Sequence, residues 1–344
     1  MPHPRISVLL PVLNGERFLD EAIGSIVTQD FRDLEFILVD DASTDGSLRI
    51  LEQWAARDSR LVVLRNEQNL GASASLNRAL AVARGEYIAR QDADDVSEPG
   101  RLRAEVEVLD AHRDVVLVSM NYHVIDERGT ILQTTRRDHP PEVVEYLLHF
   151  SNAIGGHTQV MYRRDAILAA GGYSAELRAS LDYELWTRLI RHGRFLVLPQ
   201  AGMRYRLHDD RITVRDGAYQ RHESWSATHR MLTSYLGRTI SDDELRAVAT
   251  TWRRSVSATR PDLAHAIARE AYDVFTRDHA SSVLQRSARE ATATRFAETA
   301  MTLLRHLQVR HALRHVAYSL QWDRRSVFRV VGRALRSPRF APVS

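Results

Sequence analysis

Short apolar runs alternate with amphipathic segments through the first part of the chain. Each apolar run is nearly continuous, which is typical of parallel strands that are buried on both faces. Each amphipathic segment places its apolar residues at the spacing of one helical face. The alternation predicts an α/β fold with a mostly parallel sheet flanked by helices. The predicted strands are 6–13, 34–40, 60–66 and 86–92, and the predicted helices are 16–29, 46–57 and 72–84.

The pattern changes further along the chain. Between about 96 and 215 it predicts helices at 98–112 and 181–192 and strands at 115–125, 195–200 and 203–208. Beyond about 216 the strand signal stops, and the sequence is rich in arginine and alanine with a helical period. We therefore expect one sheet-containing domain over 1–215, divided near residue 95, and a C-terminal α-helical extension over 216–344.

The composition removes several kinds of chemistry. The chain has no cysteine and no lysine, so that all 47 basic residues are arginines. Disulfides, thiolate zinc sites and cysteine nucleophiles are excluded, and so are Schiff-base and phosphate-binding lysines. No apolar run approaches the ~20 residues of a membrane-spanning helix, and the N-terminus lacks the charged and apolar regions of a signal peptide. We expect a cytoplasmic protein.

The net charge of +3 conceals an uneven distribution. Residues 1–215 carry 26 arginines against 32 acidic residues, whereas residues 216–344 carry 21 against 12. An acidic first part and a basic second part indicate two regions with different partners.

Polar or turn-forming residues follow each of the first four predicted strands. Ligands of open α/β sheets bind at the carboxyl ends of the strands, so we expect these clusters to face one crevice. The clusters are Pro11 to Asn14, Asp40–Asp41, Asn66 to Gly71, and Asp92 to Asp95.

The acidic stretch ARQDADDVSEP (89–99) has two interpretations. Side chains of an extended chain repeat every two residues, so Asp92 and Asp94 can address one ligand. Paired carboxylates of this kind suit a hard divalent cation that also binds phosphates. The alternative is a solvated acidic turn that caps a helix starting near Ser97 and Glu98.

The stretch VDDASTDGS (39–47) matches a calcium-loop pattern that starts at Asp41, with Gly46 and Glu52 in register. A calcium loop of that type follows a helix, whereas this stretch follows a predicted strand. We therefore expect a turn that leads into a helix. Asp40 then lies at the strand tip, where its carboxylate can accept a hydrogen bond from a nucleobase or ribose.

Three further features are weak by themselves. Asn69 and Gly71 lie in a turn before a helix, where backbone N–H groups can approach an anion. Asp182 opens another predicted helix, and a carboxylate there is either an N-cap or a general base. His157 and His208 do not stand out among 15 histidines.

Taken in order, four stretches resemble the inverting family-2 glycosyltransferases, which have a Rossmann-like GT-A fold. They are SVLLPVLNGERFLDEAIGSIVTQDF, FILVDDASTDGS, NLGASASLNRALAVARGEYIARQDADD and GGY…LDYELWTRL, and the resemblance runs from about residue 5 to 215. It implies a GT-A catalytic domain in which about 1–95 bind the nucleotide sugar and about 96–215 bind the acceptor.

The resemblance also implies roles for individual residues. Asp92 would contact the ribose or the sugar, and Asp94 would bind Mg²⁺ or Mn²⁺ together with His208. Asp182 matches the general base, although Leu181 stands where many relatives have a glutamate. The residues that match the nucleotide site are Pro11, Val12, Asn14, Glu16, Asp40, Asn69 and Asn77.

The implied activity is transfer of a sugar, with inversion, from a nucleoside-diphosphate sugar to a hydroxyl of a saccharide or lipid-linked acceptor in cell-surface polysaccharide or glycolipid assembly. The cation would stabilise the departing nucleoside diphosphate, and Asp182 would accept the proton of the attacking hydroxyl. His157 matches a family position near the acceptor. A second candidate is a sugar-phosphate nucleotidyltransferase, but such enzymes typically use a glycine-rich loop and lysines. A third is a non-catalytic metal-binding or membrane-scaffold protein on a degenerate GT-A fold, which Leu181 keeps open.

Residues 323–340 predict a basic amphipathic helix. Such a helix can lie on an anionic membrane surface, or its apolar stripe can pack on the protein, and the sequence favours neither. The basic region contains no recognisable nucleic-acid-binding motif, so nucleic acid is not an expected partner. The stripe consists of Val327, Val330, Val331, Ala334 and Leu335.

Overall fold

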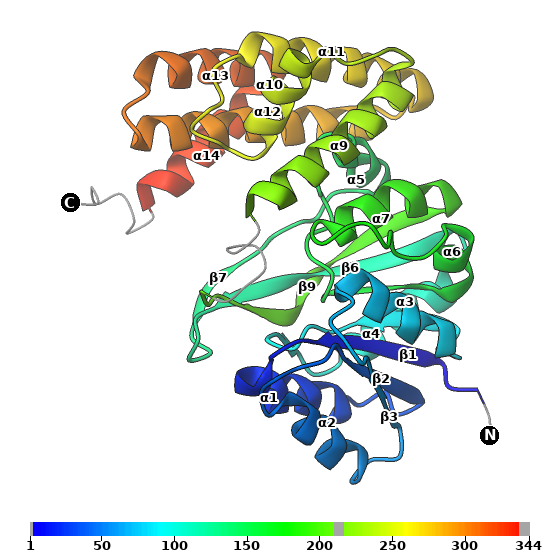
Figure 1. Cartoon of the computed structure of the whole chain (residues 1–344). Coiled ribbons are helices and arrows are strands. Elements are labelled where there is room, and N and C mark those ends of the chain that lie inside the picture. Colours follow the sequence, from blue (N-terminus) through cyan, green and yellow to red (C-terminus); the bar gives the residue numbers. More distant parts are fainter. Residues whose placement is uncertain (1–2, 210–216, 337–344) are drawn as a thin grey trace. The chain divides into compact units, whose positions relative to one another are not determined.

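The computed structural model describes residues 3–209 and 217–336 (Figure 1). Within these residues the chain forms two compact units. The sheet unit is drawn from 1–141 and 154–223, and the helical unit from 142–153 and from 224 onwards. Each unit contains its own cluster of buried apolar side chains.

The first part of the sheet unit consists of alternating strands and helices, as predicted. In chain order they are β1 (Ile6–Val12), α1 (Glu16–Val27), β2 (Leu34–Asp40), α2 (Ser47–Ala55), β3 (Leu61–Arg65), α3 (Ala72–Val82) and β4 (Tyr87–Arg90). The strands pair in the order β3–β2–β1–β4, and every pair is parallel. The carboxyl ends of four strands therefore lie at one edge of the sheet, where ligands bind in such folds.

The second part of the sheet unit extends this sheet with strands of both directions. β8 pairs antiparallel with β4 and β6, β9 pairs parallel with β6 and antiparallel with β5, and β7 pairs antiparallel with β6. The sheet order is β3–β2–β1–β4–β8–β6–β9–β5, so the sheet as a whole is mixed. The elements are β5 (Val96–Ser97), α4 (Arg101–Ala111), β6 (Val115–Ile125), β7 (Ile131–Thr134), β8 (Val160–Arg163), α6 (Arg164–Ala169), α7 (Leu181–Leu189), the 3₁₀ helix η1 (Ile190–His192) and β9 (Arg194–Arg206).

The predicted strands 195–200 and 203–208 are one long strand, β9, in the structure. The register of β9 against β6 shifts on both sides of Asn121, and β9 continues through these shifts. Gly202 packs so closely on β6 that a β carbon there would lie 2.4 Å from the sulfur of Met120. Because β9 is continuous, its C-terminal end reaches the loop that follows β4.

The helical unit contains most of α5 (Pro141–Leu148) and α9 (Gly217–Leu236). It also contains α10 (Asp242–Trp252), α11 (Pro261–Asp278), α12 (Ser282–Arg305), α13 (Val309–Trp322) and α14 (Arg324–Arg336). Large aromatic side chains occupy its core, and the rings of Phe150 and Trp252 stack with centroids 4.3 Å apart. A capping box between Ser241 and Glu244 fixes the start of α10.

The C-terminal helix α14 packs its apolar stripe on the protein over the residues that are described. Val327 and Val330 are buried, and the Ser326 hydroxyl donates a hydrogen bond to the carbonyl of Glu290 on α12 (3.4 Å). This part of the stripe therefore packs on the protein and is not available to a membrane surface. The side chains of Ala334 and Leu335 lie outside the described residues. Across 3–209 and 217–336, no helix combines the length and the apolar character that a membrane crossing requires.

Candidate functional site

The carboxyl ends of β1 and β2 bring together three residues predicted to line a nucleotide pocket. The two strands pair in register, so Pro11 lies beside Val39 and Val12 beside Asp40. Asp40 is buried, and its Oδ1 accepts a hydrogen bond from the Ser43 N–H (3.3 Å). Its Oδ2 is also buried and has no hydrogen-bond partner among the described residues. A buried polar atom without a partner costs free energy, so Oδ2 favours a ligand that donates a hydrogen bond.

Asn14 and Glu16 shape the loop after β2. The side-chain oxygen of Asn14 accepts a hydrogen bond from the Thr44 N–H (2.8 Å), and the Asn14 N–H donates to the Ser43 hydroxyl (3.0 Å). Glu16 Oε2 accepts a hydrogen bond from the Gly46 N–H (2.8 Å). A β carbon on Gly46 would collide with that carboxylate, so the loop can approach only because this residue is glycine.

Asp41 fixes the loop after β3. Its carboxylate accepts hydrogen bonds from the Asn66 side chain (2.7 Å) and from the N–H groups of Leu70 and Gly71 (both 2.8 Å). The exposed Asn69 accepts a further bond from the Gly71 N–H (3.0 Å) and so completes the same turn. Sequence reasoning expected Asp41 to face the crevice together with Asp40, whereas in the structure Asp41 is buried and bonded to the loop after β3. The available signal was the doubled acid, because neighbouring side chains of a strand point to opposite faces and only one of the two can face a ligand.

Two buried side chains shape the acidic loop after β4. The Gln91 amide donates to the backbone carbonyls of Asp92 (3.1 Å) and Asp95 (2.8 Å). Arg90 donates to Asp92 Oδ1 (2.6 Å) and to the carbonyl of Leu9 on β1 (2.6 Å). The loop is thereby closed on itself and anchored to the neighbouring strand.

Asp94 and His208 meet across the site. His208 follows β9, and its Nε2 lies 2.8 Å from Asp94 Oδ2, although the two residues are 114 positions apart. The His208 ring packs on Phe18 of α1, with ring centroids 5.3 Å apart. The loop after β1 lies against the acidic loop, because a β carbon on Gly15 would be 3.1 Å from that of Ala93. The predicted nucleotide pocket and the two predicted metal ligands are therefore adjacent.

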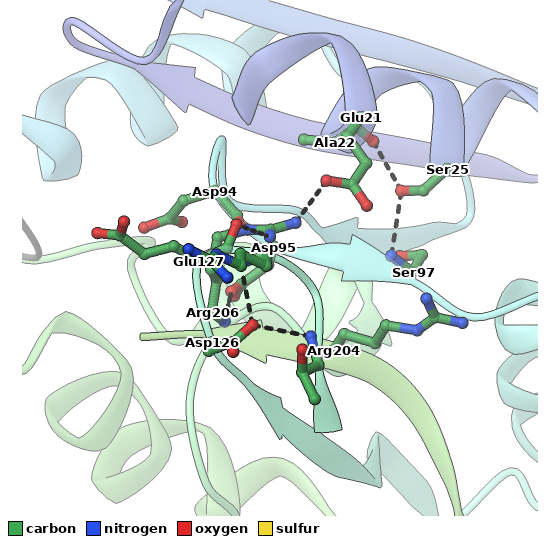
Figure 2. A network of polar contacts seen from close by, with 12 residues as sticks. Glu21, Ala22, Ser25, Asp94, Asp95, Ser97, Asp126, Glu127, Arg204 and Arg206 are labelled. Atoms are coloured by element: carbon green, nitrogen blue, oxygen red, sulfur yellow. Dashed lines mark hydrogen bonds and ion pairs between the residues drawn. The ribbon is translucent and has the colours of Figure 1, made fainter. Parts of the chain in front are cut away.

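Arg206, the last residue of β9, ties the acidic loop to its surroundings (Figure 2). Its N–H donates to Asp95 Oδ1 (2.9 Å), and its guanidinium donates to the carbonyls of Asp94 (3.0 Å) and Glu127 (3.0 Å). The same guanidinium forms an ion pair with Glu21 of α1. Arg206 and Asp95 are both buried. The network therefore holds the acidic loop in place from the interior of the protein, and Asp95 is part of this network.

Burial and like charge act together on the aspartates of this loop. Burial raises the pKa of Asp92; Arg90 opposes the rise, and Asp94 adds to it. Burial, together with the charges of Asp94 and Asp92, raises the pKa of Asp95 well above its usual value. Raised pKa values mean that the surroundings of the loop disfavour the ionised form of each carboxylate. A cation at the loop would favour the ionised forms.

The side chains at this loop fit a divalent cation of the Mg²⁺ or Mn²⁺ type. A carboxylate oxygen of Asp94 and a ring nitrogen of His208 that lie 2.8 Å apart can bind one ion together. In the part of the chain that the structure describes, no three or more acidic or histidine side chains are grouped as a metal site. The protein would thus contribute two ligands, which suits a cation that also binds substrate phosphates, as Mg²⁺ commonly does.

Asp182 lies in the first turn of α7. The other acid of that turn, Glu184, is held by Arg188 in an ion pair of 2.7 Å. Burial raises the pKa of Tyr173 to about 12, and the charges of Asp92 and Asp182 both contribute to that rise. Both carboxylates are therefore within electrostatic reach of one phenol, which brings Asp182 into the neighbourhood of the acidic loop.

His157 lies next to the same phenol. Its ring packs edge-on against Tyr173 and Trp186, with centroid distances of 5.3 and 5.5 Å. Burial and the nearby charge of Arg90 lower the pKa of His157 well below its usual value, so the ring is neutral at physiological pH. Its Nε2 is buried and has no hydrogen-bond partner among the described residues. A neutral ring of this kind can bind a ligand hydroxyl but supplies no charge.

Asn77 uses both of its polar atoms within the protein. Its Nδ2 donates to the Tyr173 carbonyl (2.8 Å), and its Oδ1 accepts from the Tyr173 N–H (2.9 Å). Gly172 has a φ of +70°, and a β carbon there would lie 2.8 Å from Asn77 Oδ1. Asn77 thus holds the segment before α7 against α3. Its Nδ2 and Oδ1 can each form one further hydrogen bond, so its role in the nucleotide site stays a prediction.

Comparison with known proteins identifies the family. The sequence profile described as Glycosyl transferase family 2 matches residues 7–169. EpsE of Bacillus subtilis (strain 168), which is named as a glycosyltransferase, is 38% identical over 224 residues, which are 63% of this chain and 78% of EpsE. The chain belongs to glycosyl transferase family 2. Among its relatives in that family, TuaG of Bacillus subtilis (30% identical, 55% of this chain and 73% of TuaG) is named for teichuronic acid biosynthesis, and AmsE of Erwinia amylovora (28% identical, 61% and 79%) for amylovoran biosynthesis.

Solved structures share the fold of this family-2 chain at low sequence identity. S. aureus TarS 1–349 in complex with UDP-GlcNAc has a TM-score of 0.57 and 18% identity, with 96% of this chain and 91% of TarS 1–349 covered. The mannosyltransferase PcManGT from Pyrobaculum calidifontis, in complex with GDP-Man and Mn²⁺, has a TM-score of 0.54 and 18% identity, with 93% and 88% covered. The predicted GT-A type of fold with C-terminal helices is confirmed, and family membership confirms the prediction of a glycosyltransferase over a nucleotidyltransferase.

Proposed function

We propose that this family-2 enzyme transfers a sugar, with inversion, from a nucleoside-diphosphate sugar to an acceptor hydroxyl, and that it uses Mg²⁺ or Mn²⁺. The observation that carries the proposal is the 2.8 Å contact between Asp94 and His208 at the carboxyl ends of β4 and β9. Solved neighbours that bind UDP-GlcNAc, or GDP-Man with Mn²⁺, support a nucleotide sugar as the donor and a divalent cation as the cofactor.

The donor end of the site is formed by residues after β1, β2 and β4. Asp40 Oδ2 would accept a hydrogen bond from the base or the ribose, beside Pro11 and Val12. Asp92, which Arg90 holds at 2.6 Å, would accept a hydrogen bond from the ribose or the sugar. The cation, held by the carboxylate and imidazole named above, would offset the diphosphate charge and stabilise it as the leaving group.

The acceptor end of the site rests on Asp182 and His157. Asp182 would accept the proton of the acceptor hydroxyl as its oxygen attacks the anomeric carbon from the face opposite the diphosphate. A single displacement inverts the configuration and needs no covalent carboxylate, unlike a retaining glycosidase, which needs two carboxyl groups flanking the bond. One carboxylate is therefore sufficient, which accommodates Leu181. The buried Nε2 of His157 would bind the acceptor.

The relatives support one class of acceptor. TuaG and AmsE are named for the biosynthesis of teichuronic acid and amylovoran, which supports a saccharide or lipid-linked acceptor in cell-surface polysaccharide or glycolipid assembly. A cytoplasmic location stays a prediction.

The donor and metal assignments are tested by ligand binding. A thermal-shift screen of nucleotide sugars with Mn²⁺ should find a donor that raises the unfolding temperature, since only a ligand of the native state stabilises it by mass action. Asp94→Asn should weaken Mn²⁺-dependent nucleotide binding at least about tenfold. Asp273→Asn, the same change on an exposed residue of α11, is the control. Equal binding by the two variants would show that Asp94 is not a metal ligand.

The base assignment is tested separately. Asp182→Asn should bind the donor normally but lose transfer by roughly 10²–10⁴-fold, because only the proton acceptor is removed. Product formation should be measured with excess donor, so that binding does not limit the rate. Near-normal turnover would refute the role of Asp182. Donor binding without transfer in the unaltered protein, with every acceptor tested, would favour a non-catalytic role on this fold.

A further inference from the structure

The hairpin of α12 and α13 in the helical unit carries exposed apolar side chains. Leu307, in the turn, is 87% exposed, and Leu313 and Val309 are 61% and 50% exposed. At 3.6 residues per turn, the three exposed apolar residues of α13 fall within about 40° of one another around the helix. We name the following five exposed residues the apolar ridge: Leu304, Leu307, Val309, Leu313 and Leu320.

The ridge is distinct from the side of α13 that packs on α12. Ala312, His315 and Ser319 are buried on that side, and the Ser319 hydroxyl donates to the carbonyl of Ala293 on α12 (2.7 Å). The core of the hairpin is formed by Ala312 with residues of α12. The two most exposed members of the apolar ridge, Leu307 and Leu313, therefore contribute little to the packing of the hairpin.

The flanks of the apolar ridge are basic. No aspartate or glutamate occurs between Glu298 and Asp323. Arg305, Arg310 and Arg314 are all exposed in this interval, and Arg314 lies 3.9 Å from Asp262 of α11. An exposed apolar row with basic flanks is the pattern of a helix that lies in a membrane interface.

We propose that the apolar ridge docks on an anionic lipid surface, with its leucines among the headgroups and its arginines on the lipid phosphates. A second copy of the chain fits less well, because a twofold interface sets the same patch against itself and would bring the arginines of one copy close to those of the other. The surface lies on α13. In the α14 stripe, for which the sequence favoured neither a membrane nor the protein, Val327 and Val330 are buried. The proposal goes beyond sugar transfer and does not depend on it.

The test is co-sedimentation of the full chain with vesicles, without donor, acceptor or metal. The unaltered chain should bind phosphatidylcholine vesicles that contain phosphatidylglycerol and should bind pure phosphatidylcholine weakly. Leu307→Gln with Leu313→Gln should reduce binding at least about tenfold, and Arg310→Gln about fivefold on the anionic vesicles only. The control is Leu132→Gln with Leu168→Gln, two exposed leucines of the sheet unit, which should bind normally.

Three outcomes would overturn the proposal. The first is equal vesicle binding by the ridge variant (Leu307→Gln with Leu313→Gln) and the control variant. The second is vesicle binding that does not depend on anionic lipid. The third is absence of vesicle binding together with a concentration-dependent dimer that the ridge variant abolishes. The last result would assign the ridge to a second copy. Thermal shift with Mn²⁺ and nucleotide, measured in the same variants, tests the proposed donor site independently of the ridge.

Discussion

Replacing Arg90 by methionine should destabilise the sheet unit and change the pH dependence of donor binding. Arg90 is buried and donates to Asp92 Oδ1 (2.6 Å) and to the carbonyls of Leu9 (2.6 Å) and Gln91 (2.9 Å). Methionine keeps an apolar chain in the same space but removes the charge and all three hydrogen bonds. The change therefore breaks the ion pair that holds the acidic loop against β1.

The expected loss follows from the burial of Arg90 and the partial exposure of Asp92. Removing one member of a buried ion pair typically costs ~3–5 kcal/mol. The Asp92 side chain is 37% exposed, so water can solvate it again, and we expect the lower end, ~3 kcal/mol. The control is Arg103→Met, because the Arg103–Asp30 pair has the same 2.6 Å separation but lies at the surface. Such a pair contributes ~0–1 kcal/mol.

The pH dependence should move in a defined direction. The pKa of Asp92 is already raised by burial, and Arg90 opposes that rise. Without Arg90 the pKa rises further, so Asp92 loses its proton only at higher pH. Since the proposed donor site uses ionised Asp92, the midpoint of the pH dependence of Mn²⁺–UDP binding should shift upward in Arg90→Met and should stay in place in Arg103→Met.

Two measurements check these expectations. Hydrogen exchange of the β1 and β4 amides reports on the sheet unit alone, and a loss of ~3 kcal/mol corresponds to roughly 150-fold faster exchange. Calorimetric titration with Mn²⁺ and UDP at several pH values gives the midpoint. The reasoning fails if Arg90→Met exchanges no faster than Arg103→Met, or if its midpoint is unmoved.

Two further changes test the interior of the sheet unit. Asp41→Asn should weaken the bonds of the Leu70 and Gly71 N–H groups by at least ~2 kcal/mol in total. The two groups donate to different oxygens of the carboxylate and an amide has only one oxygen, so one bond becomes a bond to a neutral acceptor and the other is lost; unchanged hydrogen exchange of these amides would contradict it. Glu105 is buried against Arg101, and burial raises the pKa of its carboxyl group from 4.5 to about 7. The native state therefore binds the proton of this carboxyl group more tightly than the unfolded chain does. Stability should therefore fall as pH rises between these two values, and urea titrations of Glu105→Gln should show a flatter pH dependence; an equal slope in both proteins would exclude Glu105 as its source.

The parallel part of the sheet could be predicted because buried strands leave continuous apolar runs. β2 is the clearest case, since all seven of its residues are buried. The strands β5 and β7 were missed because they leave no such run. β5 consists of Val96 and Ser97 alone, and every residue of β7 is exposed. Strands of this kind are set by their neighbours in the sheet and not by their own sequence.

The sequence could predict that the candidate site residues lie at one edge of the sheet, but it could not predict the contacts among them. Polar residues after parallel strands indicate where a ligand binds, which placed Asp40 and Asp94 at the same edge. The contact of Asp94 with His208 depends on the pairing of β9, which the sequence divided into two strands. Arg90 was overlooked because arginine is usually exposed, and nothing in its local sequence distinguishes a buried guanidinium from a solvated one.

The sequence also could not predict which of the two units contains the segment 142–153. Its apolar residues, including Val143 and Tyr146, fit a buried helix face in either unit. The structure assigns the segment to the helical unit, although strands of the sheet unit precede and follow it in the chain. Hydrophobic spacing reports that a helix face is buried but not which core buries it.

The order in which the chain is synthesised gives the Asp94–His208 contact a further consequence. Arg206 and His208 reach the acidic loop from 111 to 114 positions away. A nascent chain that has not yet extended past β9 holds Asp94 and Asp95 without the groups of Arg206 and His208 that later contact them. Cation binding at this loop should therefore begin only after the last strand is in place. During synthesis, the sheet unit would therefore become able to bind the cation in one late step, when β9 and His208 have been added.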